Sequence, residues 1–230
     1  HNPKEVEKLF DRVAPSYDTL NDLLSFGLHR IWKRQLIDYL KPSPGEDWLD
    51  LCCGTGDLAI ALAQRVGPNG TVVGVDSAEI PLDFARKRAG RNPSLEVSWL
   101  KGNVLATGLP SHKYDGAAMA YGLRNLSDPS CGLTELHRLL KPGARAGVLD
   151  FNPAIKGSAA AWFQKFYLRR VVVPIASIAG LGEEYAYLEK SLNYFPDGEG
   201  QESLAIKAGF RKAVHTTLVA GQMGILLLTA

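Results

Sequence analysis

LDLCCGTGDLA, residues 49–59, joins an apolar run that is typical of a buried strand to the start of a helix through two glycines. Gly54 and Gly56 allow the backbone to turn sharply and allow a ligand to approach the chain closely. Asp50, within the apolar run, offers a carboxylate that can accept hydrogen bonds from a cationic group. These residues predict a ligand-binding turn between a strand and a helix.

The regions before and after this turn alternate between strand-like and helix-like patterns. We expect strands at 47–52, 71–76, 94–100 and 114–122, a turn followed by a fifth strand within 141–151, and helices at 57–66, 80–90 and around 130–140. This alternation favours a mostly parallel sheet with helices on both faces. Residues 213–219 and 223–229 are predicted to be two further strands, and the short link between them predicts that they are antiparallel.

The domain organisation is predicted to be a single domain over residues 1–230. Residues 1–40 have a helical pattern that is broken near Pro15, and they are expected to form an N-terminal helical cap. Residues 152–208 form an insertion that is rich in apolar and aromatic side chains. We expect this insertion to act as a lid over the carboxyl ends of the strands, where ligands bind in open α/β sheets.

Composition excludes several classes of protein. The 26 basic and 24 acidic residues give a net charge of +2, which provides no basic footprint for nucleic acid. The three cysteines predict no disulfide framework and indicate a reducing compartment, and the five histidines form no cluster with metal-ligand spacing. The polar start of the chain is not a signal peptide, and the question of a removed targeting segment stays open.

The polar residues that follow the predicted strands favour an adenosine-containing cofactor. Asp76 ends the second strand, where an acid accepts hydrogen bonds from ribose hydroxyls, although it is also a good helix N-cap. Asn103 and the backbone of Val104 follow the third strand and are placed to contact an adenine ring. The turn itself also matches the dinucleotide fingerprint G-x-G-x-x-A, so it alone does not separate NAD from S-adenosylmethionine.

Asp50, Asn103 and the antiparallel end of the sheet together favour S-adenosylmethionine, because its ammonium group gives the acid beside the turn something to bind. The predicted fold is therefore α/β, a Rossmann-like, seven-stranded, mostly parallel sheet of the class I methyltransferase type with an antiparallel C-terminal strand. The residues expected to bind the cofactor lie at or beside the strand ends: Tyr17, Asp50, Cys52, Gly54, Thr55, Gly56, Asp76, Ser77, Asn103, Val104 and Tyr121.

Three motifs resemble one known family, the ubiquinone/menaquinone biosynthesis C-methyltransferases. YDTLNDLLSFGLHRIW (17–32) resembles the family's N-terminal signature, with Leu20 in place of the usual Met. YGLRN (121–125) and HRLLKPGARAGVLDF (137–151) resemble two further motifs, with Ala144 where a second Gly is usual. The turn and residues 150–152 and 182–188 are most similar to the branch that methylates demethylphylloquinone, whose reduced form is 2-phytyl-1,4-naphthoquinol.

The resemblance implies transfer of a methyl group from S-adenosylmethionine to a ring carbon of a reduced, prenylated quinone. It favours Arg124 as the mechanistic residue, with Asp150 as a second candidate and His29 as a third. Each has a structural alternative: a loop-fixing salt bridge for Arg124, and a core or helix-surface position for His29. The apolar insertion would hold the isoprenoid or phytyl tail.

The implied setting is the cytoplasmic or stromal side of a photosynthetic membrane. Peripheral contact with that membrane and a homodimer are both left open by the sequence. Residues 171–182, an uncharged apolar run, are too few to span a bilayer as a helix. Three alternative functions stay open: a methyltransferase for another phenolic or lipid-like acceptor, an NAD-binding oxidoreductase, and a non-catalytic subunit that binds the cofactor.

Overall fold

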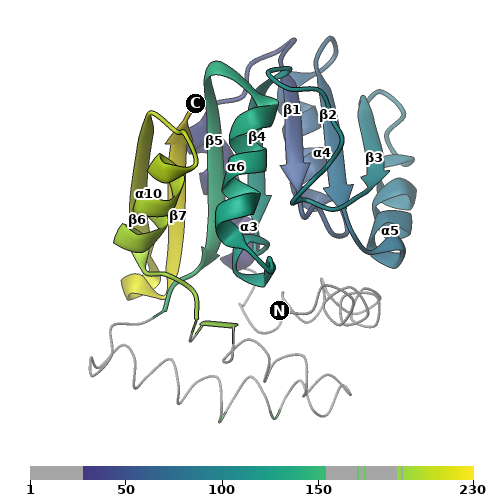
Figure 1. The fold of residues 1–230 in the computed structure, drawn as a ribbon. Helices are drawn as coiled ribbons and strands as arrows, with labels where there is room; N and C mark the ends of the chain where they lie inside the picture. The colour runs from purple at the N-terminus through teal and green to yellow at the C-terminus, as the bar shows by residue number, and fades with distance from the viewer. Residues whose placement is uncertain (1–27, 154–169, 171–173, 175–190, 193) are drawn as a thin grey trace.

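A mixed sheet of seven strands organises the computed structural model, which describes residues 28–153, 170, 174, 191–192 and 194–230 (Figure 1). The spatial order is β3-β2-β1-β4-β5-β7-β6. Pairing is parallel from β3 to β5, and β7 is antiparallel to both of its neighbours. The strands are β1 (Asp47–Leu51), β2 (Thr71–Asp76), β3 (Val97–Lys101), β4 (Tyr114–Ala120), β5 (Leu140–Phe151), β6 (Lys212–Leu218) and β7 (Met223–Thr229). The fold predicted from the sequence is confirmed.

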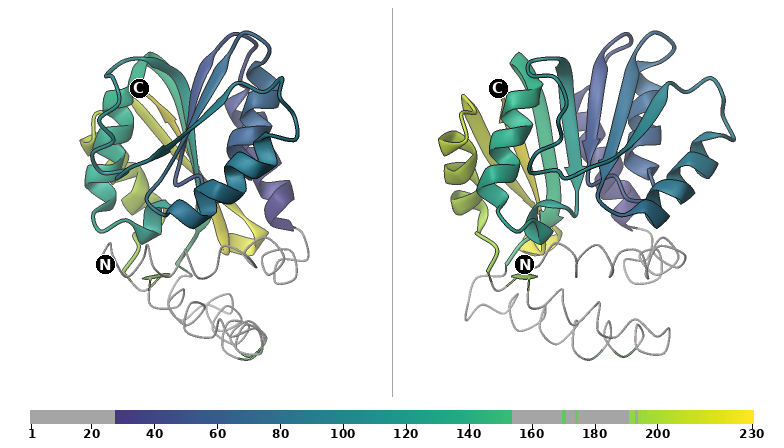
Figure 2. Two further views of the ribbon diagram at one scale, coloured as in Figure 1. Left: turned by 90° about the vertical axis from the view of Figure 1, so that its right-hand side faces the viewer. Right: turned by 45° about the vertical axis from the view of Figure 1, so that its right-hand side comes forward.

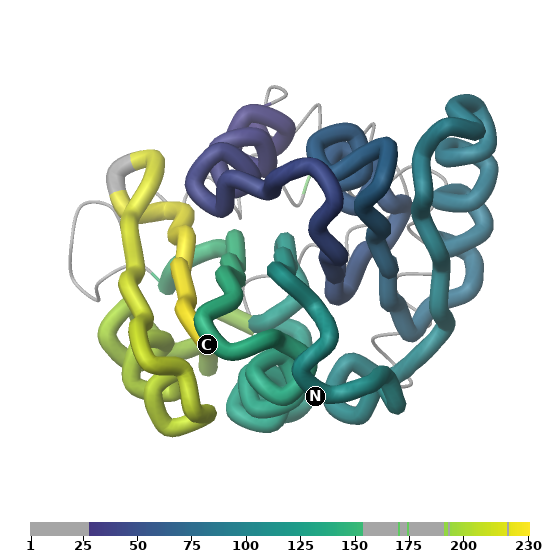
Figure 3. Tube along the Cα trace, turned by 90° about the horizontal axis from the view of Figure 1, so that it is seen from above, coloured from purple at the N-terminus to yellow at the C-terminus, as the bar shows by residue number. Residues whose placement is uncertain are grey.

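The helices lie on both faces of the sheet, as Figures 2 and 3 show. On one face, α3 contacts β4, β5 and β7, and α4 contacts β1, β2 and β3, while α5 packs against β2 and β3. On the other face, α10 packs against β6, β7 and α6. The described helices are α3 (Leu28–Leu40), α4 (Asp57–Val66), α5 (Glu79–Ala89), α6 (Pro129–Leu139) and α10 (Gly198–Lys207), with 3-10 turns η1 (Leu123–Asn125) and η3 (Val219–Gly221).

Covering both faces explains why the central strands contain almost only apolar residues. In β1, Trp48 packs in the core cluster beneath α3 and α4, whereas Leu49 and Leu51 belong to the cluster on the α6 side. The alternation of side chains along a strand produces this division, because successive residues point to opposite faces. Asp50 is the one charged residue in this buried pattern of β1 after Trp48.

Two predicted strand boundaries differ from the structure by two or more residues, for identifiable reasons, and the other differences are of one residue. The third strand begins at Val97 and not at residue 94, because the Leu95 amide donates to the Asn92 carbonyl in a turn. The fourth strand ends at Ala120 and not at residue 122, because Tyr121 adopts a left-handed conformation with φ of 62°. A left-handed tyrosine is rare, and the sequence pattern gives no sign of it.

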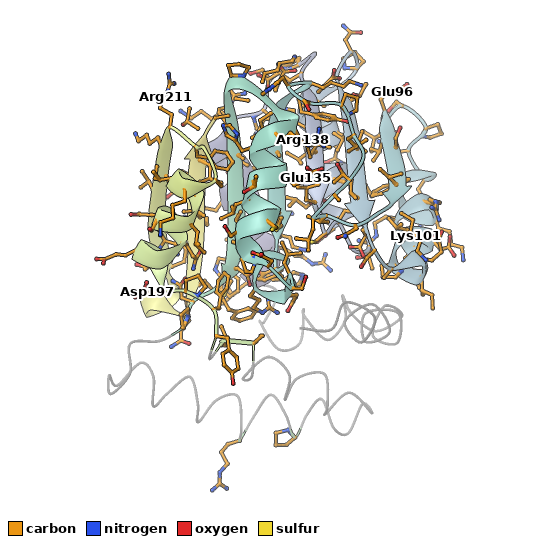
Figure 4. All side chains as sticks on the ribbon, in the orientation of Figure 1. Glu96, Lys101, Glu135, Arg138, Asp197 and Arg211 are labelled. Atoms are coloured by element: carbon orange, nitrogen blue, oxygen red, sulfur yellow. The ribbon has the colours of Figure 1, made fainter. Side chains whose placement is uncertain are left out.

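The loop between β3 and β4 is fastened to α6 by a charged network (Figure 4). Glu135 accepts hydrogen bonds from the amide and hydroxyl of Thr107 at 2.9 and 2.6 Å, and it forms an ion pair of 2.7 Å with Arg138. Arg138 in turn donates to the Leu109 carbonyl and to Ser111. These hydrogen bonds, chiefly those from Arg138, outweigh partial burial and lower the pKa of Glu135 to about 2.

Part of the predicted domain organisation falls on the described residues. Helix α3 is the described part of the expected cap over residues 1–40, and α10 lies within the expected insertion over 152–208. Asp197 caps α10 by accepting a hydrogen bond from the Gly200 amide at 2.9 Å. The aromatic positions between 162 and 187 lie outside the described residues.

Candidate active site

A cavity of about 590 Å³ lies at the carboxyl ends of β1, β2, β3 and β4, the lower edge of the sheet in Figure 1. Its position matches the general rule for open α/β sheets, because the strand order reverses between β1 and β4. The polar residues on its wall come from five separate segments: Lys33, Asp50, Thr55, Asp57, Asp76, Ser77, Lys101, Asn103, Asn125 and Ser127.

The glycine-rich turn after β1 forms one wall of the cavity. Gly54 has φ of 52°, and a Cβ built on it would meet nothing within 4 Å, so the backbone is open on that side. Gly56 has φ of 80°, and a Cβ there would lie 2.4 Å from the Trp99 ring. The two glycines therefore serve different purposes: Gly54 keeps the cavity open, and Gly56 allows Trp99 to pack beneath the turn.

Asp50 has a buried carboxyl group that makes no hydrogen bond to a described residue. Its side chain belongs to a residue that is 1% exposed, and neither carboxylate oxygen has a hydrogen-bond partner among the described residues. Burial, reinforced by repulsion from Asp57 and Asp76, raises the pKa of Asp50 well above its ordinary value. The charge of Lys33 and the nearby Ala59 amide, which does not reach hydrogen-bonding geometry, act in the opposite direction. A buried carboxylate of this kind favours a cationic ligand.

Lys33 and Asp57 form an ion pair at the cavity wall. Lys33 projects from α3, and its Nζ lies 2.7 Å from Oδ2 of Asp57 at the start of α4. Burial alone would raise the pKa of Asp57, but Lys33, Arg88 and His29 together lower it. His29 is buried one helical turn before Lys33, so the same face of α3 brings both side chains toward α4.

The ends of β2 and β3 supply the next group of polar side chains. Asp76 accepts hydrogen bonds from the amides of Gly54 and Ala78, at 2.8 and 3.0 Å, so it links the turn to the start of α5. Asn103 accepts a hydrogen bond from the Leu105 amide at 3.0 Å. Lys101 pairs with Asp76 in the sheet register, and Figure 4 shows it at the lower end of β3.

The segment after β4 forms the opposite wall. The Tyr121 carbonyl accepts hydrogen bonds from Arg124 Nη1 at 3.2 Å and from Asn125 Nδ2 at 2.9 Å, which holds the left-handed turn in place. Asn125 is 8% exposed, and its Oδ1 has no partner among the described residues. Asn125 therefore presents a hydrogen-bond acceptor at a cavity wall that already contains Tyr121.

Arg124 and Asp150 form a buried ion pair beside this wall. Nη1 of Arg124 lies 2.5 Å from Oδ1 of Asp150, and the two side chains are 10% and 2% exposed. Asp150 also accepts hydrogen bonds from the backbone amides of Arg124 and Phe151, at 3.1 and 2.8 Å. The guanidinium lies 5.1 Å from the centre of the Phe151 ring. The pair thus ties the turn after β4 to the end of β5.

The structure brings together most residues that the sequence predicted as cofactor ligands. Nine of them line the cavity: Asp50, Cys52, Gly54, Thr55, Asp76, Ser77, Asn103, Val104 and Tyr121. Gly56 supports the turn from beneath, and Tyr17 lies outside the described residues. The three predicted catalytic residues, Arg124, Asp150 and His29, are not among the lining residues.

Sequence reasoning missed five polar residues of the wall: Lys33, Asp57, Lys101, Asn125 and Ser127. A signal existed for three of them. His29 and Lys33 are four residues apart in a helical pattern, Asp57 directly follows the glycines, and Asn125 belongs to the YGLRN motif. The sequence does not show that α3 crosses the turn, and this crossing is what places Lys33 in the cavity.

The thiols of Cys52 and Cys53 lie in the same region but stay protonated. Burial, together with the carboxylates of Asp50 and Asp76, raises the pKa of both thiols well above the ordinary value. Within the described part of the chain, no group of His, Cys, Asp and Glu side chains could hold a metal ion. The described wall offers carboxylates, two lysines, hydroxyls, amides and backbone groups.

S-adenosylmethionine fits this set of groups. The uncompensated carboxylate of Asp50 suits the cofactor's ammonium group, and Asp76 is a hydrogen-bond acceptor at the place where a ribose binds in such folds. The open side of Gly54 leaves room for a close approach to the backbone.

Comparison with known proteins agrees with this fit. A model of the ubiE/COQ5 methyltransferase family matches residues 1–227. The 2-phytyl-1,4-naphtoquinone methyltransferase of Nostoc sp. is 46% identical over 226 residues, which cover 98% of each chain. The chloroplastic 2-phytyl-1,4-beta-naphthoquinone methyltransferase of Arabidopsis thaliana is 40% identical over 222 residues, covering 95% of this chain and 85% of that protein.

The fold is also found in solved structures. The crystal structure of a SAM-dependent methyltransferase from Aquifex aeolicus superposes with a TM-score of 0.62 and 19% identity, covering 86% of this chain and 88% of that chain. Because the family model matches almost the whole sequence, this chain belongs to the ubiE/COQ5 methyltransferase family and is an S-adenosylmethionine-dependent methyltransferase.

Proposed function

We propose that this enzyme methylates a ring carbon of a reduced, prenylated naphthoquinone, 2-phytyl-1,4-naphthoquinol, or the matching demethylmenaquinol. The observation that carries the proposal is the 46% identity to the Nostoc sp. methyltransferase across 98% of both chains. Membership of a methyltransferase family excludes the NAD-binding oxidoreductase. Other phenolic or lipid-like acceptors are the competing substrates.

The chemistry requires the quinol and not the quinone. When bound, S-adenosylmethionine supplies an electrophilic methyl group on its sulfonium. An oxidised quinone ring is electron-poor, so its carbon is a weak nucleophile. Loss of a proton from a quinol hydroxyl pushes electron density onto the ortho carbon, which would take up the methyl group as the bond between methyl and sulfur breaks. That ring carbon then loses its hydrogen as a proton and the oxygen regains one, so the net products are the methylated quinol, S-adenosylhomocysteine and one proton. The enzyme must therefore align the two reactants and receive that proton.

We assign Arg124 to the stabilisation and orientation of the oxygen that carries this developing charge. A guanidinium stays protonated, so Arg124 does not take the proton itself. Its ion pair with Asp150 and its hydrogen bond to the Tyr121 carbonyl fix its position beside the cavity wall. Asp150 and His29 are the proposed proton acceptors, and both are buried close to groups that line the cavity.

We propose that the remaining predicted ligands hold the cofactor as one unit. The nine residues that line the cavity, with Gly56 beneath them, support this assignment by their common position. Tyr17 is assigned to the cofactor's methionine end through the family resemblance alone. Residues 1–230 would act as a single methyltransferase domain, which the family match over residues 1–227 supports.

The phytyl or isoprenoid tail directs the enzyme to a membrane surface. No helix in the described part of the chain is both long and apolar enough to cross a bilayer. Because the proposed substrate carries a long apolar tail, we place the enzyme on the cytoplasmic or stromal face of a photosynthetic membrane, in peripheral contact with it. The chloroplastic relative from Arabidopsis thaliana is consistent with this location.

A methyl-transfer assay tests the function. Labelled S-adenosylmethionine is incubated with demethylated phytyl-naphthoquinone in detergent, with and without a chemical reductant. We expect labelled phylloquinone only with the reductant, because only the quinol has a nucleophilic ring carbon. Equal turnover of a rigorously oxidised quinone would refute the quinol mechanism. An absence of turnover in both samples, with the cofactor still bound in calorimetry, would refute the quinone assignment.

A further inference from the structure

We propose that Lys33 is the residue that binds the carboxylate of the cofactor's amino-acid group. The inference depends on the cofactor and not on the proposed quinol acceptor. S-adenosylmethionine ends in an α-amino acid, whose ammonium and carboxylate leave the same carbon atom. A site for this group must therefore offer an acid and a base side by side.

The acid and the base are present at the end of β1. Asp50 offers a buried carboxylate that lacks a hydrogen-bond partner among the described residues. Lys33 lines the same cavity, and its charge stabilises the ionised forms of both Asp50 and Asp57. These effects place the ammonium of Lys33 within electrostatic range of both carboxylates, which is the pairing that a zwitterionic ligand requires.

The other described lysine of the wall does not meet this requirement. Lys101 ends β3, which is separated from β1 by β2 in the sheet. It pairs in register with Asp76, the residue assigned to the ribose. A carboxylate bonded to the carbon that bears the ammonium cannot reach from Asp50 to the end of β3, so Lys33 is its cationic partner.

The surroundings of Lys33 hold it in a position to bind an anion. The side chain is 13% exposed, and its Nζ lies 2.7 Å from Asp57 Oδ2 and 5.6 Å from the centre of the Tyr121 ring. It therefore lies between the glycine-rich turn and the wall after β4. An ammonium group can donate up to three hydrogen bonds, so Asp57 can orient Lys33 while a ligand carboxylate shares it.

Calorimetry with two ligands tests the proposal without any quinone. The ligands are S-adenosylmethionine and its decarboxylated analogue, which keeps the ammonium and lacks only the carboxylate. We expect wild-type protein to bind the complete cofactor about 10- to 100-fold more tightly, the usual contribution of a charge-assisted hydrogen bond. In Lys33→Met, the two ligands should bind with nearly equal affinity. Arg34→Met, an exposed position on the same helix, should keep the wild-type ratio.

Each result can be assigned to one cause. An unchanged ratio in Lys33→Met, or no discrimination by wild-type protein, would overturn the role of Lys33. Failure of wild-type protein to bind either ligand would overturn the cofactor assignment, and the proposal with it. If Lys33→Met does not fold because Asp57 loses its partner, the double variant Lys33→Met/Asp57→Asn removes both charges. It should show the same loss of discrimination.

Discussion

Substitution of Asp50 by Asn should stabilise the protein and weaken its binding of the cofactor. Asp50 is 1% exposed and has no hydrogen-bond partner among the described residues. An unsatisfied buried polar group costs about 1–3 kcal/mol, and a charge costs more. Asparagine keeps the shape and removes the charge. Because the neutral amide still lacks a partner, the gain is only the extra cost of the buried charge. We therefore expect Asp50→Asn to raise the free energy of unfolding of the cofactor-free protein, by about 1.4 kcal/mol for each pH unit between the ordinary pKa of Asp50 and its raised pKa in the folded protein, counted up to pH 7.

The raised pKa of Asp50 determines how the free energy of unfolding should change with pH. The pKa of Asp50 in the folded protein lies above its ordinary value of 3.8. The folded state therefore holds this proton more tightly than the unfolded state. The stabilisation is fully present below about pH 3.8 and is lost as the pH rises through the folded pKa. The difference in stability between Asp50→Asn and wild type should grow over the same pH range and then level off.

Urea unfolding between pH 4 and pH 8, together with calorimetry of cofactor binding, measures both effects. We expect cofactor affinity to fall by about 10- to 100-fold in Asp50→Asn, because the ammonium loses its charged partner. Asp83→Asn makes the same chemical change at an exposed position of α5 and should change neither quantity. A variant that is less stable than wild type at pH 7, or one that binds the cofactor normally, would refute the reasoning.

Four further substitutions test other parts of the protein. Gly56→Ala should lower the free energy of unfolding by about 1–3 kcal/mol in urea titrations, because its Cβ would overlap the Trp99 ring at a positive φ. Gly54→Ala meets no atom within 4 Å, so it should weaken cofactor binding more than it weakens folding, and equal losses would contradict this distinction. Glu135→Gln should lower the free energy of unfolding at pH 7 by at most about 3 kcal/mol, because the pKa of Glu135 is about 2 in the folded protein and 4.5 ordinarily. This difference should shrink as the pH falls from 4.5 toward 2, and a constant difference would contradict the ion-pair explanation. Arg124→Lys should reduce kcat in the methyl-transfer assay by at least about 10-fold while cofactor affinity in calorimetry stays near the wild-type value, since the shorter lysine lacks the guanidinium Nη1 that donates to both Asp150 and the Tyr121 carbonyl. A loss of affinity instead would assign Arg124 to cofactor binding.

The sheet could be predicted from the sequence because the apolar runs, the turn residues at their ends and the lengths of the links all indicate the same strands. The second strand is observed at Thr71–Asp76 and the seventh at Met223–Thr229, both as predicted, since apolar runs are bounded by turn residues at these places. The antiparallel end of the sheet followed from the short link at residues 220–222, which leaves no room for a crossover helix.

The site was predictable in part, for a physical reason. Residues attached to a strand end, such as Asp76 and Asn103, have positions that follow from the parallel sheet, because carboxyl ends meet at one edge. Lys33 depends on the path of α3 across the glycine-rich turn, and this tertiary packing has no local signature. The left-handed conformations of Cys52 and Tyr121 also depend on their surroundings, because only those surroundings offset the strain.

Three unfavourable features of the described structure lie together at the point where the strand order reverses, although Lys41, His112 and Val219 have a positive φ elsewhere. Cys52 and Tyr121 follow directly after the neighbouring strands β1 and β4, and both have a positive φ, of 58° and 62°. Asp50 is buried without an ordinary partner two residues before Cys52. At a reversal the connections leave β1 and β4 toward opposite faces, so a cavity opens between them and backbone strain is tolerated. The cavity wall is thus less stable than the core, and ligand contacts that relieve the charge of Asp50 would stabilise the folded state.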